Sequence, residues 1–177
     1  MKIVRSLPLA ILLTSALVLG AVVSYFQVFQ ISDVQVEDWF TVSNQKIWRW
    51  DAEAGQWREV GSEPTIHGGD IIKITYDFRN DANRDVEAKH QLVITESATF
   101  ASTDDVDIVK FKLWDNEKED ITESETASGY DYIATSSSYI HTAETEGEAF
   151  FIVYFNPWFY PQTVSFTVKV MPGEAPR

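Results

Sequence analysis

The chain has 177 residues, a formal net charge of −13 and no cysteine. The lack of cysteine excludes disulfides, thiolate metal sites and cysteine nucleophiles, and the acidic excess argues against binding to nucleic-acid phosphates. Hydrophobic residues make up 45% of the sequence, which is enough for a packed core and argues against a disordered chain.

The N-terminal segment predicts export from the cytoplasm. Lys2 and Arg5 precede an apolar run from Leu7 to Val23, which is the layout of a signal peptide or a membrane anchor. The centre of the run has the length of a signal-peptide core, while its extended form approaches the roughly 20 residues that span a bilayer. We therefore expect residues 1–24 to form one hydrophobic helix, cleaved or retained, and the remainder to be extracellular or on the cell surface.

The next segment, residues 25–36, is predicted to be extended. It either forms an ordinary first strand or completes the sheet of a neighbouring subunit, and the second option builds a head-to-tail filament. As a donor strand it would bring apolar side chains to the interface, namely Tyr25, Phe26, Val28, Phe29, Ile31, Val34 and Val36.

Residues 37–177 are predicted to form one domain built from strands. Apolar and polar residues alternate with the period of a half-buried strand in four runs, which are residues 72–78, 86–97, 109–113 and 164–170. Residues 46–51 and 56–60 predict a hairpin in which Trp48 and Trp50 share a face, with Trp57 nearby on the partner strand. The polar window 115–126 fits a loop, and residues 127–147 suggest one or two short edge strands. These elements predict an all-β fold, a β-sandwich of the jelly-roll or immunoglobulin-like kind.

An aromatic stretch lies near the C-terminus. Residues 150–155 are predicted to form a strand buried on both faces. Trp158, Phe159 and Tyr160 follow between two prolines and are a candidate exposed patch for a partner subunit, a glycan or a membrane interface.

Sites for chemistry are weakly marked in this sequence. Three histidines lie far apart and are most simply structural, because none has the close partner of a zinc site. Asp104, Asp105 and Asp107 form either a solvated acidic loop or a calcium site. No sequence motif marks a nucleophile, so we expect no enzymatic activity and no cofactor.

Three features together resemble a known family. The chain has a leader that ends in Ser24-Tyr25-Phe26, a strand from Gly69 to Asn80, and a closing strand from Val164 to Val170. In this layout it resembles the TasA/camelysin-type secreted jelly-roll proteins, which include archaeal bundling-pilus subunits. The resemblance implies that the leader is removed and that the mature protein polymerises by donor-strand complementation into extracellular biofilm fibres. The chain departs from the family after Phe26, where it reads Gln27-Val28-Phe29-Gln30 instead of a Ser-Asp-rich stretch.

The sequence therefore predicts a structural subunit that assembles with copies of itself, contacts a membrane only through its N-terminal segment, and binds no nucleic acid. One alternative is a membrane-anchored accessory subunit of a larger surface complex, docked through residues 158–160. Another is a carbohydrate-binding or hydrolytic surface module that uses exposed tryptophans as sugar platforms.

Overall fold

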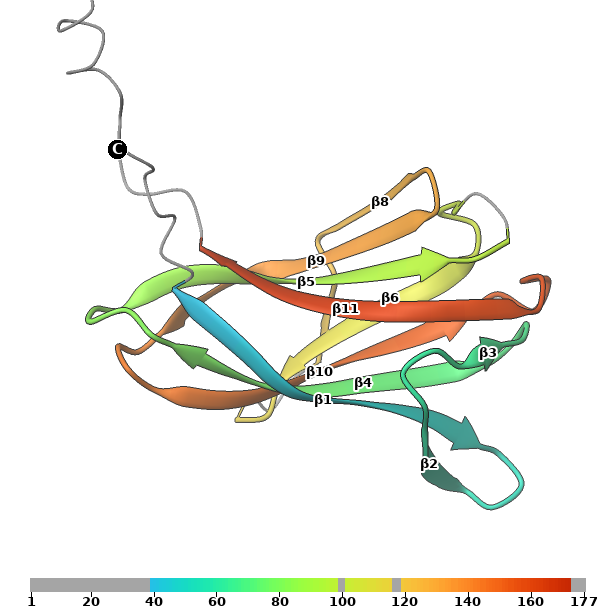
Figure 1. Ribbon diagram of the computed structural model, residues 1–177, viewed down its shortest axis with the longest axis horizontal. Coiled ribbons are helices and arrows are strands. Elements are labelled where there is room, and N and C mark those ends of the chain that lie inside the picture. Colours follow the sequence, from blue (N-terminus) through green and yellow to red (C-terminus); the bar gives the residue numbers. More distant parts are fainter. Residues whose placement is uncertain (1–38, 99–100, 116–118, 173–177) are drawn as a thin grey trace, which may run out of the picture. The chain divides into compact units, whose positions relative to one another are not determined.

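The computed structural model describes residues 39–98, 101–115 and 119–172, which contain eleven β-strands (Figure 1). These strands belong to one compact unit, Asp38–Arg177. The predicted N-terminal helix and the candidate donor strand, residues 25–36, lie outside the described residues.

The strands form two antiparallel sheets. The first, called the β4 sheet here, has the order β2 (Gln56–Val60), β1 (Phe40–Asp51), β4 (Ile71–Asn80), β10 (Glu146–Phe155), β6 (Val106–Leu113) and β7 (Asp120–Ile121). The second, the β5 sheet, has the order β3 (Thr65–Ile66), β11 (Gln162–Pro172), β5 (Val86–Glu96), β9 (Asp131–His141) and β8 (Ser124–Ser128). The prediction of an all-β fold is confirmed.

Both sheets contribute to one hydrophobic core. The alternating sequences decide which side chains enter it, because successive residues of a strand point to opposite faces. Ile72, Ile74 and Tyr76 of β4 are at most 1% exposed, and Leu92 and Ile94 of β5 are fully buried. The four strands that the alternation predicted are present as β4, β5, β6 and β11.

The predicted hairpin is confirmed as β1 and β2. Trp50 lies opposite Trp57, and their rings meet edge to face with centroids 5.4 Å apart. Such aromatic cross-strand pairs contribute roughly 0.2–1 kcal/mol beyond an alanine pair. Gly55 closes the turn with φ +63°, a backbone conformation that glycine adopts without steric cost.

The prediction of short edge strands in residues 127–147 is wrong. Residues 131–141 form β9, an eleven-residue strand that pairs with β5 on one side and β8 on the other. Its core-facing side is partly small or polar, since Ala134 and Ser136 are fully buried beside Tyr132. These residues weaken the apolar period, so the sequence did not distinguish an inner strand from an edge strand.

A buried asparagine joins two corners of the fold. The Asn80 side chain is 0% exposed, and its amide nitrogen donates to the carbonyls of Arg84, His141 and Thr142 at 3.0–3.1 Å. Its side-chain oxygen accepts the Ala82 backbone N–H at 3.0 Å. One side chain thus fixes the β4–β5 corner against the β9–β10 connection.

Candidate functional site

The outer edge of β11 is the first candidate interaction site. In the described residues, β3 covers this edge only at Gln162 and Thr163, while β5 pairs with the other edge over the length of the strand. Val164 donates its backbone N–H outward to the Pro64 carbonyl at 3.1 Å. Because backbone groups alternate along a strand, the even-numbered residues from Phe166 to Val170 direct their N–H and C=O groups to the edge that no described strand covers.

The side chains of the same even-numbered residues point into the core. Val164, Phe166 and Val168 are 0–6% exposed, and Val170 is half-buried against the core. A strand added to this edge would therefore lie beside both open hydrogen-bonding groups and the apolar interior. An edge of this kind is a template for another chain unless it is covered.

The first half of β1 lies next to this edge. β2 pairs with β1 only from Ile47 to Asp51, so no described strand covers the β1 edge before Ile47. The Gln45 side chain of β1 donates from Nε2 to the Phe166 carbonyl at 2.8 Å. A single amide thus occupies one acceptor of the open β11 edge, and β1 and β11 form no backbone ladder with each other.

The outer face of the β4 sheet is the second candidate site. This face carries aromatic and lysine side chains, and we call it the aromatic–lysine face. Its members are Lys46 and Trp48 on β1, Lys73 on β4, Phe150 on β10, Lys110 and Lys112 on β6, and Trp114 just after β6. The strand register brings them together, since Trp48 lies opposite Lys73 and Lys112 opposite Phe150. The sequence does not reveal this grouping, because the residues lie far apart in the chain and come from four strands.

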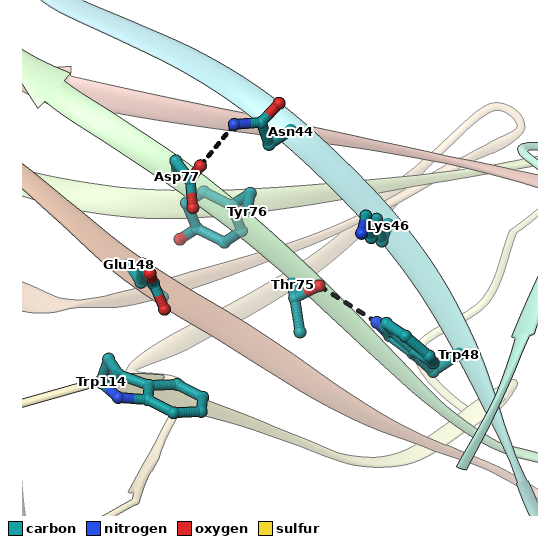
Figure 2. Close-up of a pocket in the computed structure, with 9 residues that line it drawn as sticks. Asn44, Lys46, Trp48, Thr75, Tyr76, Asp77, Trp114 and Glu148 are labelled. Atoms are coloured by element: carbon teal, nitrogen blue, oxygen red, sulfur yellow. Dashed lines mark hydrogen bonds between the residues drawn. The ribbon is translucent and has the colours of Figure 1, made fainter.

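A hollow of about 370 Å³ lies on this face and is shown in Figure 2. Lys46 and Trp48 border it from β1, and Trp114 borders it on the far side. Hydrogen bonds fix two positions of its floor: Asn44 donates to Asp77 at 2.6 Å, and the Trp48 indole N–H donates to the Thr75 hydroxyl at 3.1 Å.

A second hollow of about 330 Å³ adjoins the first, because Thr75 and Trp114 line both. Its other lining residues are Lys73, Lys112 and Phe150. The Lys73 ammonium lies 4.5 Å from the ring centroid of Trp57 and 5.8 Å from that of Trp48. Partial burial lowers the pKa of Lys73 from its usual value. Hydrogen-bonding groups, aromatic rings and lysines thus share one shallow surface.

The candidate aromatic patch at residues 158–160 is only partly exposed. Trp158 and Tyr160 are 73% and 68% exposed. Phe159 requires a correction, because it is 3% exposed and its ring packs against Phe155 at 4.9 Å between centroids. The turn in which Phe159 N–H donates to the Asn156 carbonyl at 3.0 Å directs this ring inward and its neighbours outward.

The acidic loop that contains Asp104, Asp105 and Asp107 shows ordinary turn contacts. The Asp105 carboxylate accepts the Ser102 backbone N–H at 2.6 Å, and the Asp105 carbonyl accepts the Asn156 N–H at 3.1 Å. Within the described ranges, no three histidine, aspartate or glutamate side chains lie close enough together to hold a metal ion.

Two of the three histidines meet in the core, which the sequence did not indicate. His90 Nε2 lies 3.1 Å from His141 Nε2, and His90 Nδ1 lies 2.7 Å from the Tyr76 hydroxyl. Burial, and secondarily His141, hold the pKa of His90 well below its usual range, and burial lowers the pKa of His141. His90 is fully buried, so this cluster belongs to the core and not to an accessible site.

The part of the chain that the structure describes contains no helix with the length and apolar character needed to cross a membrane.

The sequence matches no known protein family and no curated protein. Among solved structures it is similar to a chain described as "AvmM Catalyzes Macrocyclization in Alchivemycin A Biosynthesis", with 12% identity and a TM-score of 0.48 over 79% of this chain and 92% of that chain.

This comparison corrects one expectation. The lack of a nucleophile motif predicted a protein without enzymatic activity, whereas the similar chain is an enzyme, and the prediction is withdrawn. At this TM-score the likeness assigns neither a reaction nor catalytic residues to the present chain.

Proposed function

We propose that the protein is an exported subunit of an extracellular filament that assembles with copies of itself by donor-strand complementation. The observation that carries the proposal is the edge of β11, which no described strand covers beyond Thr163, and where alternate backbone groups from Phe166 to Val170 face outward beside buried or half-buried apolar side chains. In donor-strand complementation, a strand from one subunit supplies main-chain hydrogen bonds to a sheet edge of the next, and its alternate side chains fill pockets.

The donor in this proposal is residues 25–36. The acceptor edge from Val164 to Val170 is about 23 Å long, at 3.3 Å per residue of an extended strand. Residues 25–36 are numerous enough to span this length as a strand. Phe29 and Ile31, like Val34 and Val36, are spaced by two, so each pair would point to the same face of a strand. Because the donor belongs to one subunit and the acceptor to the next, the contact is head-to-tail and does not close.

The proposal includes the finer fold type. From β4 onward the long strands alternate strictly between the sheets: β4, β6 and β10 lie in one sheet, and β5, β9 and β11 lie in the other. Such repeated crossing supports a jelly-roll sandwich more than an immunoglobulin-like one. Residues 1–24 are the leader in this scheme, and assembly follows export.

The test is a deletion of residues 25–36 in the exported protein. We expect the variant to form no fibres by negative-stain microscopy and to remain a folded but less stable monomer, because the β11 edge stays uncovered. A synthetic peptide of residues 25–36, added to this variant, should bind and raise its melting temperature. A peptide with the same composition in scrambled order is the control.

Two results contradict the proposal. One is that fibres persist in the deletion variant. The other is that the intact protein, with its leader removed, stays monomeric at all concentrations while the peptide fails to bind the deletion variant.

Exposed Trp158 and Tyr160 favour a second candidate, a membrane-anchored accessory subunit docked on a larger surface complex. Intact mass of the native protein separates the two, since this candidate requires an uncleaved N-terminus and extraction with detergent.

A further inference from the structure

The two sheets differ in the side chains of their outer faces. The β5 sheet presents mainly hydroxyl and amide side chains, such as Gln91, Thr95, Thr135, Ser165 and Thr167. The β4 sheet presents the aromatic–lysine face. The outer face of an antiparallel sheet that contacts solvent is usually polar. The outer face of the β5 sheet follows this rule, whereas the exposed aromatic rings of the aromatic–lysine face depart from it.

The lysines of this face stand out against the charge of the protein. The formal net charge is −13, yet Lys46, Lys73, Lys110 and Lys112 are on the same side of one sheet. Lys110 lies 3.6 Å from Glu119. Among the described residues, no carboxylate forms an ion pair with Lys46, Lys73 or Lys112.

The aromatic rings offer flat surfaces beside these charges. The Trp114 side chain is 63% exposed and borders both hollows. In Figure 2 its ring extends from the end of β6 toward the middle of the first hollow. Phe150 lines the second hollow with Lys73 and Lys112. A ring of this kind presents a negatively polarised face to the C–H groups of a ligand.

The remaining groups of the first hollow suit hydroxyl recognition. Asp77 and Glu148 supply carboxylate acceptors, and Asn44 and Thr75 supply neutral polar groups. The combined hollows have about the size of a small-ligand site. The hollows contain no arginine, the side chain that binds phosphate in a bidentate manner.

We propose that the aromatic–lysine face binds an acidic oligosaccharide of the uronate type. Sugar hydroxyls lie against Asn44, Asp77 and Glu148 in the first hollow, and a sugar ring stacks on Trp114. The carboxylate of a neighbouring sugar is held by Lys73 and Lys112 in the second hollow. The charge complementarity of lysine and carboxylate carries the choice of ligand. This site is on a sheet face and does not use the β11 edge.

The test is calorimetric titration of the whole protein with hexagalacturonate and with its neutral methyl ester. We expect hexagalacturonate to bind and the ester to bind at least about tenfold more weakly, because the ester cannot form charged pairs with lysine. Added salt should weaken the binding of the acid more than that of the ester.

Variants locate the site. We expect the double variant Lys73→Gln with Lys112→Gln to bind hexagalacturonate about tenfold more weakly or worse. We expect the same loss for the single variant Trp114→Ala. Lys169→Gln, on an exposed position of the β5 sheet, is the matched control and should leave the affinity unchanged. Melting temperatures of all variants establish that they are folded.

Three outcomes overturn the proposal. The first is that neither sugar binds, and the second is equal binding of the acid and its ester. The third is that the protein self-associates and that the double substitution Lys73→Gln with Lys112→Gln abolishes this self-association. In that case the face binds the acidic surface of a second copy of the protein.

Discussion

The buried chain of Tyr76, His90 and His141 has one proton arrangement in which the Tyr76 hydroxyl proton finds an acceptor. The Tyr76 hydroxyl donates to His90 Nδ1 over 2.7 Å, and His90 Nε2–H donates to His141 Nε2 over 3.1 Å. The reverse direction would leave the Tyr76 hydroxyl proton without an acceptor in the described residues. We therefore assign neutral imidazoles, with the proton on Nε2 of His90 and on Nδ1 of His141.

These histidines make stability depend on pH. Both have folded-state pKa values below the usual value, so the unfolded chain binds protons first as the pH falls. The contribution to stability is complete above about pH 6.5, the unfolded pKa, and is lost below it at up to about 1.4 kcal/mol per pH unit for each histidine. Urea unfolding between pH 7.5 and 5 should show a free energy of unfolding that declines toward acid.

His90→Asn should be less stable at neutral pH and should lose part of this pH dependence. An identical pH dependence in wild type and His90→Asn would contradict the assignment of a neutral His90.

At the scale of elements, the sequence predicts strands well where one face is apolar and the other polar. β4 is an example, since Ile72, Ile74 and Tyr76 alternate with Lys73 and Thr75. β9 is a counterexample, because its core side includes small and hydroxyl residues. Its place between β5 and β8 depends on partners that lie elsewhere in the sequence.

The candidate sites were less predictable than the strands. Lys73 and Lys112 were visible as outward residues of predicted strands, but their proximity depends on β10, which lies between β4 and β6. Strand order is a property of the assembled sheet and leaves no local signal. The exposure of Trp158 and Tyr160 was predicted from their prolines, while the burial of Phe159 depends on Phe155.

One glycine sets the distance between two connections. A Cβ on Gly68 would lie 2.1 Å from the Pro157 carbonyl oxygen, which belongs to the backbone and has little room to move. Gly69 also donates its N–H to the Asn156 carbonyl at 3.3 Å. The turn before β4 and the loop between β10 and β11 are thus in direct contact, and this contact supports the loop that exposes Trp158.

Gly68→Ala should therefore lower the free energy of unfolding by about 2–4 kcal/mol, because the added methyl group forces backbone to move. Denaturant unfolding measures the change. Gly61→Ala is the matched control, since a Cβ there meets no atom within 4 Å, and it should change the stability by less than about 0.5 kcal/mol. Equal effects of the two substitutions would show that the close approach of Gly68 does not constrain the loops.

At the scale of the whole molecule, the two edges of β11 have different partners. Val170 directs its N–H to the open edge, whereas Lys169 directs its N–H to β5 by the same alternation. Proline removes a backbone N–H and is tolerated on the outer side of an edge strand. The pair Val170→Pro and Lys169→Pro therefore separates assembly from folding.

Val170→Pro should reduce fibre formation while it changes the free energy of unfolding of the monomer by about 1 kcal/mol or less. Lys169→Pro should destabilise the monomer by about 1–3 kcal/mol, because a ladder hydrogen bond to β5 is lost. Microscopy and thermal unfolding measure the two effects. Normal fibres from Val170→Pro would exclude this edge as the acceptor.

The order of strands within the sheets also constrains when the chain folds. β10 lies between β4 and β6, and β11 covers β5, so most long ladders join segments that are far apart in sequence. Distant pairings are slow, because the loop entropy is lost before the contacts are gained. During synthesis, neither sheet can be completed until residues 146–172 have left the ribosome. Each sheet therefore keeps an unpaired edge, at β4 and at β5, until β10 and β11 are available.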